Sequence, residues 1–147
     1  MWNRMAYQRV RLDQERDLLA RYEPQFTVNV QESLTLSGWH RSSANRPYQI
    51  QMFTPAVYPD APPDTFVSSP SPLQDFWRLP MERHETSHKM HTWKTSRPGW
   101  TKICLVQPEV WSAEYTLPKM ITKARLWIEA YECHLDDGTP IKSFLLG

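Results

Sequence analysis

Two cysteines are the residues of this chain whose type and setting could carry nucleophilic chemistry. Cys104 stands between Ile103 and Leu105, in a short segment that leaves an irregular region, and a thiol there can be reached by solvent. A thiolate is both a good nucleophile and a good leaving group, which suits the formation and transfer of a thioester. The alternative for Cys104 is a small buried hydrophobe, as many free cysteines are. Cys133 lies near the end of a predicted helix, where we expect it to pack.

A cluster of histidines offers a second chemistry. Residues 84–88 read HETSH and match the HExxH pattern, in which two histidines on one helix face bind zinc and the glutamate acts as a base. Here Arg83 and Lys89 flank the pattern, Pro80 precedes it closely, and no apolar stripe runs through it. We therefore expect a solvated loop without a metal ion, and zinc hydrolysis is the less favoured hypothesis. His91, just beyond the pattern, could instead shape a site at Cys104.

The composition is that of a folded domain, with 40% hydrophobic and 22% charged side chains. The 17 basic residues nearly balance the 16 acidic ones, so there is no sizeable positive field and nucleic-acid binding is not expected. No apolar run approaches the ~20 residues that span a bilayer, and the N-terminus lacks the hydrophobic segment of a signal peptide. We expect a cytoplasmic protein without membrane contact, where a lone thiol stays reduced.

Hydrophobic periodicity predicts an N-terminal helix followed by an antiparallel meander. Met5, Leu12 and Leu19 recur at seven-residue spacing among charged neighbours, which predicts a helix over residues 3–21 that Pro24 closes. Period-two alternation then predicts three strands, and a short run adds a fourth. These four segments are residues 26–30, 34–39, 48–52 and 65–67.

Periodicity stops after the meander and returns in a second helix. Residues 68–100 hold prolines, serines and three histidines without a repeat, and a loop of this length inside a domain is often functional. A helical apolar face then begins at Leu117, with Thr116 as a plausible N-cap and Pro118 tolerated in the first turn.

The order of helix, meander, loop and helix predicts an α+β fold with helices over one face of the sheet. We expect a single domain over residues 1–147, without an internal repeat. Within it, residues 68–100 form a long loop next to the candidate active site, and residues 135–147 form a C-terminal tail.

Two motifs stand in order ahead of the second helix. Residues 58–63 read YPDAPP between the third and fourth predicted strands, and Gly99, residues 103–105 (ICL) and Trp111 follow. This series resembles the ubiquitin-conjugating enzyme family, in which a YPxxPP turn follows the third strand. In that family a Gly-x-Ile-Cys-Leu segment and a tryptophan lead into the central helix. The resemblance covers roughly residues 3–134. The fixed positions of the first motif are Tyr58, Pro59, Pro62 and Pro63.

The resemblance implies a ubiquitin-conjugating-like fold and acyl transfer between proteins. Cys104 would accept a protein C-terminus as a thioester from an activating enzyme and pass it to a target amine, normally a lysine. The short tail resembles the bacterial conjugating proteins of CBASS and related anti-phage operons. In those proteins the passenger is a ubiquitin-like protein or a cGAS-like nucleotidyltransferase. No metal or organic cofactor is implied.

The chain departs from the family just ahead of the cysteine. Where the family has His-Pro-Asn, this chain has His91-Thr92-Trp93. The resemblance gives His91 the task of shaping the loop, whereas the asparagine's donation to the developing oxyanion has no assigned residue. Backbone amides near Cys104 or three hydroxyls could replace it, those of Thr92, Thr95 and Ser96. The alternative functions are a catalytically inactive conjugating-fold binding module, with Cys104 buried and inert, and an HExxH zinc hydrolase.

Overall fold

The computed structural model describes residues 5–145 of the chain. These residues contain two α-helices and six strands, joined by loops and short 3-10 helices. The first helix ends ahead of Pro24, as predicted, while its expected start at residue 3 lies outside the described residues. The helices are α1 (Ala6–Tyr22) and α2 (Leu117–Asp137), and the short 3-10 helices are η1 (Met81–His84), η2 (Pro108–Val110) and η3 (Ile141–Phe144). The strands are β1 (Thr27–Val30), β2 (Leu34–Arg41), β3 (Pro47–Phe53), β4 (Asp64–Ser69), β5 (Thr92–Trp93) and β6 (Thr101–Ile103).

The buried face of α1 is partly polar. Leu12 and Leu19 are buried, as their spacing predicts, but Met5 is 58% exposed, so the predicted stripe was wrong at that end. Gln8 and Glu15 complete the buried face at helical spacing. Because a buried polar group needs hydrogen-bond partners, these two residues must be tied to specific groups elsewhere in the fold.

Strands β1 to β4 form the predicted antiparallel meander, and the register places buried side chains in rows across it. Leu36 pairs with Met52, Met52 with Thr65, and Thr65 with Ile103 of β6. All four side chains are at most 2% exposed, so this row lies on the buried face of the sheet. Alternation along each strand leaves the next residues on the open face.

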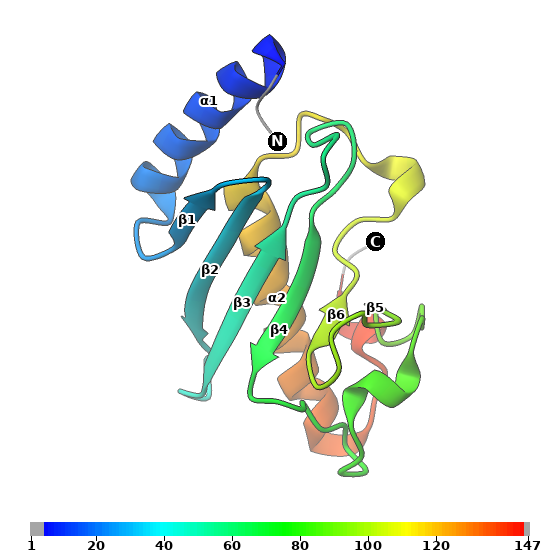
Figure 1. The fold of residues 1–147 in the computed structure, drawn as a ribbon. Helices are drawn as coiled ribbons and strands as arrows, with labels where there is room; N and C mark the ends of the chain where they lie inside the picture. Colours follow the sequence, from blue (N-terminus) through cyan, green and yellow to red (C-terminus); the bar gives the residue numbers. More distant parts are fainter. Residues whose placement is uncertain (1–4, 146–147) are drawn as a thin grey trace.

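The sheet contains two strands that the sequence did not predict. β6 pairs with β4, and β5 pairs with β6, so the order is β1-β2-β3-β4-β6-β5 (Figure 1). The four-strand prediction was therefore incomplete, because strands of two or three residues are too short to show alternation. The α+β class is confirmed, with all strand pairs antiparallel.

Helix α2 crosses behind the sheet, and α1 lies at the side of β1 (Figure 1). The Thr116 hydroxyl accepts the backbone N–H of Lys119, which confirms the predicted cap, and Pro118 lies in the first turn. The helix ends at Asp137, so residues 135–137 belong to α2 and not to the predicted tail. Gly138, with a φ of 84°, terminates it in the left-handed conformation that favours glycine. Among the helices of residues 5–145, none is long and apolar enough to cross a membrane.

The loop between β4 and β6 packs onto the domain through buried apolar side chains. Leu73, Met81 and Met90 are at most 5% exposed. The C-terminal segment fastens to the same loop, because Ile141 is fully buried and the backbone N–H of Lys142 donates to the carbonyl oxygen of Lys89 at 2.9 Å. The loop and the tail therefore lie together on the side of the sheet that carries β5 and β6.

Candidate functional site at Cys104

Cys104 directly follows β6 and is held to the segment that carries His91. Its backbone N–H donates to the carbonyl oxygen of His91 at 2.8 Å. The same oxygen accepts the indole N–H of Trp127 from α2 at 3.1 Å. His91 has a φ of 50°, a left-handed conformation that non-glycine residues seldom adopt. The structure thus brings the two predicted residues, Cys104 and His91, together at one shared carbonyl.

Two pockets meet at Cys104 and His91, which line both of them. We call the larger one, of about 570 Å³, the helix pocket, because it lies against α2. The smaller one, of about 150 Å³, is the loop pocket. The Cys104 side chain is only 6% exposed, so a reactant reaches the thiol through one of these pockets. The helix pocket is further lined by Leu105, Lys123, Leu126, Trp127, Glu129, Ala130, Cys133, Phe144 and Leu145. The loop pocket is further lined by Thr86, Ser87, His88, Thr92, Trp93 and Gln107.

Two side chains that carry N–H groups act on the thiol of Cys104. The side-chain amide of Gln107 donates to Sγ at 3.7 Å, and the indole of Trp93, which lines the loop pocket with Cys104, acts on the thiol by lowering its pKa. Burial raises the pKa of the thiol above 9.0, the negative charge of Glu109 raises it further, and Trp93 lowers it. These side chains favour the thiolate, or an oxyanion that forms beside it, against the cost of burial.

Sequence reasoning missed both of these side chains. Trp93 stands where the family has its asparagine and carries a side-chain N–H, which was a usable signal. Gln107 belongs to no motif, and its donation depends on the path of the chain after Cys104.

His91 is placed to accept a proton. Desolvation lowers the pKa of its imidazole below 6.5, and the positive charge that His88 carries when protonated lowers it further. The two rings stack with their centroids 5.6 Å apart. The imidazole is therefore neutral near pH 7, the state in which it can act as a base.

The YPxxPP motif contacts the segment that follows the cysteine. Tyr58 is fully buried, and its hydroxyl donates to the carboxylate of Glu15 on α1. The carbonyl oxygen of Pro59 accepts the indole N–H of Trp111 at 2.9 Å. The centroids of the Tyr58 and Trp111 rings lie 6.4 Å apart. The first motif is thus joined to α1 on one side and to the predicted tryptophan on the other.

The remaining prolines of the motif lie close to the cysteine segment. Pro62 and Pro63 line a third pocket, of about 250 Å³, together with Ile103 and Leu105. These two apolar residues flank Cys104 in the chain. The turn therefore lies across this pocket from the two residues that flank the thiol.

Gly99 occupies a position that only glycine fits well. Its φ is 88°, and a Cβ there would lie 2.8 Å from the hydroxyl oxygen of Ser71. That hydroxyl donates to the Gly99 carbonyl oxygen at 2.8 Å, which ties the end of the long loop to its beginning. The backbone conformation and the contact with Ser71 thus explain why residue 99 is a glycine. Gly99 lines none of the three pockets described above.

The three hydroxyl candidates for an oxyanion donor differ in their placement. Thr92 lines the loop pocket, but its hydroxyl donates to the carbonyl oxygen of Glu85 at 2.8 Å. Thr95 forms a local turn in which its hydroxyl accepts the backbone N–H of Arg97. Neither Thr95 nor Ser96 lines the helix pocket or the loop pocket. The geometry therefore favours Gln107 over these hydroxyls.

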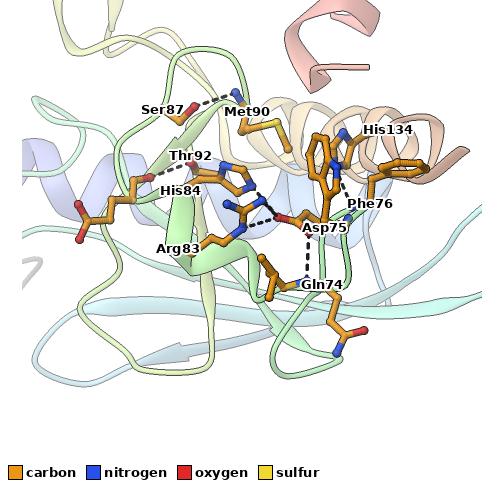
Figure 2. A network of polar contacts seen from close by, with 12 residues as sticks. Gln74, Asp75, Phe76, Arg83, His84, Ser87, Met90, Thr92 and His134 are labelled. Atoms are coloured by element: carbon orange, nitrogen blue, oxygen red, sulfur yellow. Dashed lines mark hydrogen bonds and ion pairs between the residues drawn. The ribbon is translucent and has the colours of Figure 1, made fainter. Parts of the chain in front are cut away.

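The HExxH pattern does not form a metal-binding helix. His84 ends η1, and its Nε2 lies 3.0 Å from the carboxylate of Asp75, which Arg83 also contacts (Figure 2). Glu85 leaves the 3-10 helix with a φ of 50°, so His84 and His88 do not share a helix face. Within residues 5–145, no three His, Cys, Asp or Glu side chains are grouped to hold a metal ion. The local geometry gives the zinc-hydrolase alternative no support.

The two cysteines reverse the exposure that the sequence indicates. Cys104 is buried and Cys133, expected to pack, is exposed. Cys104 is inward because β6, which was not predicted, carries the chain into the sheet immediately before it. Cys133 lies on α2 between the buried residues Tyr131 and His134, one position away from the inward face.

Iodoacetamide should modify Cys133 at least about tenfold faster than Cys104 at about pH 8, because the reagent attacks thiolates and needs access. Mass spectrometry of peptides from the folded protein, sampled over time, measures both rates. In urea the two rates should converge. Equal rates in the folded protein would mean that the pockets give Cys104 an open path to bulk solvent.

Comparison with known proteins adds no assignment: no family model, no curated protein and no solved structure matches the chain. The site has the features of one that does nucleophilic thiol chemistry. Its thiol is buried and reached through pockets, an N–H group donates to the sulfur, and a neutral imidazole lines the same pockets. The function is inferred below from these features.

Proposed function

We propose that the chain is an acyl carrier of the ubiquitin-conjugating type, which holds the C-terminus of another protein as a thioester on Cys104. It passes that acyl group to a target amine, normally a lysine. The observation that carries the proposal is the placement of Cys104, whose thiol lies where two pockets meet and accepts an N–H bond from Gln107. By resemblance, the passenger is a ubiquitin-like protein or a cGAS-like nucleotidyltransferase in bacterial anti-phage defence.

The arrangement of the elements supports a ubiquitin-conjugating-like fold. The N-terminal helix, the meander, the YPxxPP turn, the cysteine and a long helix follow one another in the order that the family requires. The turn also contacts Trp111 through the carbonyl oxygen of Pro59, so both motifs converge beside the cysteine segment. The same fold gives the chain its proposed partners, an activating enzyme and a lysine-bearing target.

The loading step is a thioester exchange. The Cys104 thiolate attacks the carbonyl carbon of the activating enzyme's thioester, and a new C–S bond forms to Sγ. The bond to the activating enzyme's sulfur breaks, and that sulfur leaves as a thiolate that takes up a proton. The negative charge that develops on the carbonyl oxygen lies beside Sγ, where the N–H group of Gln107 can stabilise it.

The transfer step makes an amide. An uncharged lysine amine attacks the carbonyl carbon, the C–N bond forms, and the bond to Sγ breaks to restore the Cys104 thiolate. The amine loses a proton, and the neutral imidazole of His91, which lines both pockets, can accept it. Burial also favours the uncharged amine over the ammonium ion.

The proposal is tested by incubating the protein with ATP and a lysate of its native host, followed by non-reducing electrophoresis. We expect an adduct of one protein's mass that needs ATP and that hydroxylamine cleaves, as a thioester requires. Cys104→Ser should convert it into an ester that survives thiol treatment. Cys133→Ser removes the other thiol and should still form the labile adduct, because Cys133, although it lines the helix pocket, is exposed and serine nearly preserves its shape.

A different outcome favours the second candidate, a conjugating-fold binding module. The observation in its favour is the low exposure of Cys104, at 6%, together with the raised pKa of its thiol. If no hydroxylamine-sensitive adduct forms, the carrier proposal fails and the binding module replaces it.

A further inference from the structure

An acyl carrier needs space for two chains at one sulfur. The acyl chain must remain beside Sγ while the amine approaches the same carbonyl carbon. The helix pocket and the loop pocket, which meet at Cys104, offer two separate routes. Their difference in size and lining allows each route to be assigned.

The helix pocket suits a peptide chain. Its volume of about 570 Å³ falls within the range of roughly 300–1,000 Å³ typical of ligand sites, whereas the loop pocket at about 150 Å³ does not. Trp127 and Ala130, which line the helix pocket, are at most 3% exposed, so its inner wall is apolar. The pocket also holds one charge of each sign, Lys123 and Glu129, so an acidic side chain there would meet a repelling carboxylate as well as an attracting ammonium group while losing hydration against the apolar wall.

The chain's own tail already lies along this pocket. Phe144 and Leu145 line it, and Leu145 has extended backbone angles and packs against the core. The tail is anchored upstream, where Ile141 is fully buried. An extended apolar segment close to a chain terminus is therefore compatible with this surface.

We propose that the helix pocket binds the apolar carboxyl-terminal segment of the carried protein, namely the two or three residues before the one whose carbonyl joins Cys104. The inference rests on the proposed function and deepens it, because it gives the donor a sequence preference. Apolar side chains lie against α2, and acidic ones are rejected. The loop pocket, which His88 and Gln107 line, is left for the incoming amine.

The test uses two synthetic peptide thioesters, acetyl-Ser-Leu-Leu-Gly and acetyl-Ser-Glu-Glu-Gly, each joined to 2-mercaptoethanesulfonate. Attack by Cys104 forms the acyl–Sγ bond and releases mercaptoethanesulfonate, so intact-mass spectrometry follows the loading. All proteins carry Cys133→Ser, and each rate is divided by the rate with N-acetylcysteine to remove intrinsic reactivity. We expect the leucine peptide to load at least about tenfold faster, since burial of its two leucine side chains against the apolar wall favours the bound state.

Two variants show where the preference arises. Leu126 is 55% exposed and lines the helix pocket, so Leu126→Glu should keep the fold and reduce the preference to less than about threefold. Val10 on α1 is 58% exposed and lines none of the three pockets, so Val10→Glu should preserve it. Equal loading of both peptides by the parent protein overturns the inference and leaves the carrier function standing.

Absence of loading by both peptides overturns the carrier function instead. The pocket is then tested with the same peptides as free acids and the Cys104→Ala protein, with the indole N–H of Trp127 observed by NMR. Binding of the leucine peptide alone, lost in Leu126→Glu, supports the pocket. No shift with either peptide rejects it.

Discussion

Replacement of Trp127 by alanine is expected to lower the free energy of unfolding by about 3–5 kcal/mol, the usual loss for a large buried aromatic side chain. Trp127 is 1% exposed and stacks on Tyr131 with the two rings nearly parallel. Its indole N–H donates to the carbonyl oxygens of Met90 and His91, each at 3.1 Å. Because the His91 oxygen also accepts the backbone N–H of Cys104, Trp127 joins α2 to the site.

The phenylalanine variant separates packing from positioning. Trp127→Phe keeps a ring in the core but leaves the carbonyl oxygens without the indole donor, for an expected loss of about 1–2 kcal/mol. We also expect alkylation of Cys104 to become faster under native conditions, in a Cys133→Ser background, because the His91 segment is held less firmly. Urea titration and thiol labelling provide the two readouts.

An exposed tryptophan supplies the control for this series. Trp39 is 52% exposed, so Trp39→Phe should change the stability by less than about 0.5 kcal/mol and leave the labelling rate unchanged. If Trp127→Phe loses stability while Cys104 labels at the parent rate, Trp127 acts in packing alone and does not position the site.

The elements that could be predicted from the sequence are those long enough to show a period. The alternation in β2 and β3 and the apolar face of α2 extend over several turns or pairs, so their pattern stands out from chance. In α1 the same approach failed in detail, because Gln8 and Glu15 lie on the buried face. A hydrophobic pattern does not reveal that a polar residue is buried when its hydrogen-bond partners come from another element.

The site was predictable only where a motif marked it. Cys104 and His91 were identified from the order of motifs, and they do meet at one carbonyl. Trp93 could have been found from its place in the motif, whereas the donation by Gln107 depends on how the chain folds around the sulfur, which neither spacing nor composition reports. The burial of Cys104 remained one of two alternatives for the related reason that β6 is too short to be seen in the sequence.

A buried carboxylate fixes how the first helix, the YPxxPP turn and α2 meet. Glu15 is 1% exposed and accepts the hydroxyl of Tyr58 and, at 3.0 Å, the backbone N–H of Leu117 at the start of α2. Arg11, one turn earlier on α1, lies 3.5 Å from the same carboxylate. The guanidinium of Arg11 also donates to the carbonyl oxygens of Ala113 and Tyr115 ahead of α2. The carboxylate of Glu15 thus connects α1, the YPxxPP turn and the start of α2.

Removal of this carboxylate should be as damaging as the loss of Trp127. Glu15→Ala leaves the donors of Tyr58, Leu117 and Arg11 without their shared acceptor, and loss of one partner of a buried ion pair costs about 3–5 kcal/mol. Asp13→Ala, at an exposed position of the same helix, is the matched control and should cost less than about 0.5 kcal/mol. Urea denaturation measures both. A loss below about 1 kcal/mol for Glu15→Ala would show that water replaces the carboxylate.

The pH dependence of stability gives a second, independent measure of the same group. Desolvation raises the pKa of Glu15 above 4.5, in spite of the lowering effects of Tyr58, Arg11 and Leu117. The folded state therefore holds the proton of Glu15 more tightly than the unfolded state, and the contribution of Glu15 to the stability falls as pH rises from about 4.5 through the folded pKa. Glu15→Gln cannot titrate, while every other carboxylate is present in both proteins. The difference in unfolding free energy, parent minus Glu15→Gln, should thus decrease over that window in urea titrations at several pH values. An increase with pH would mean that the three donors outweigh desolvation and hold the carboxylate in its charged form.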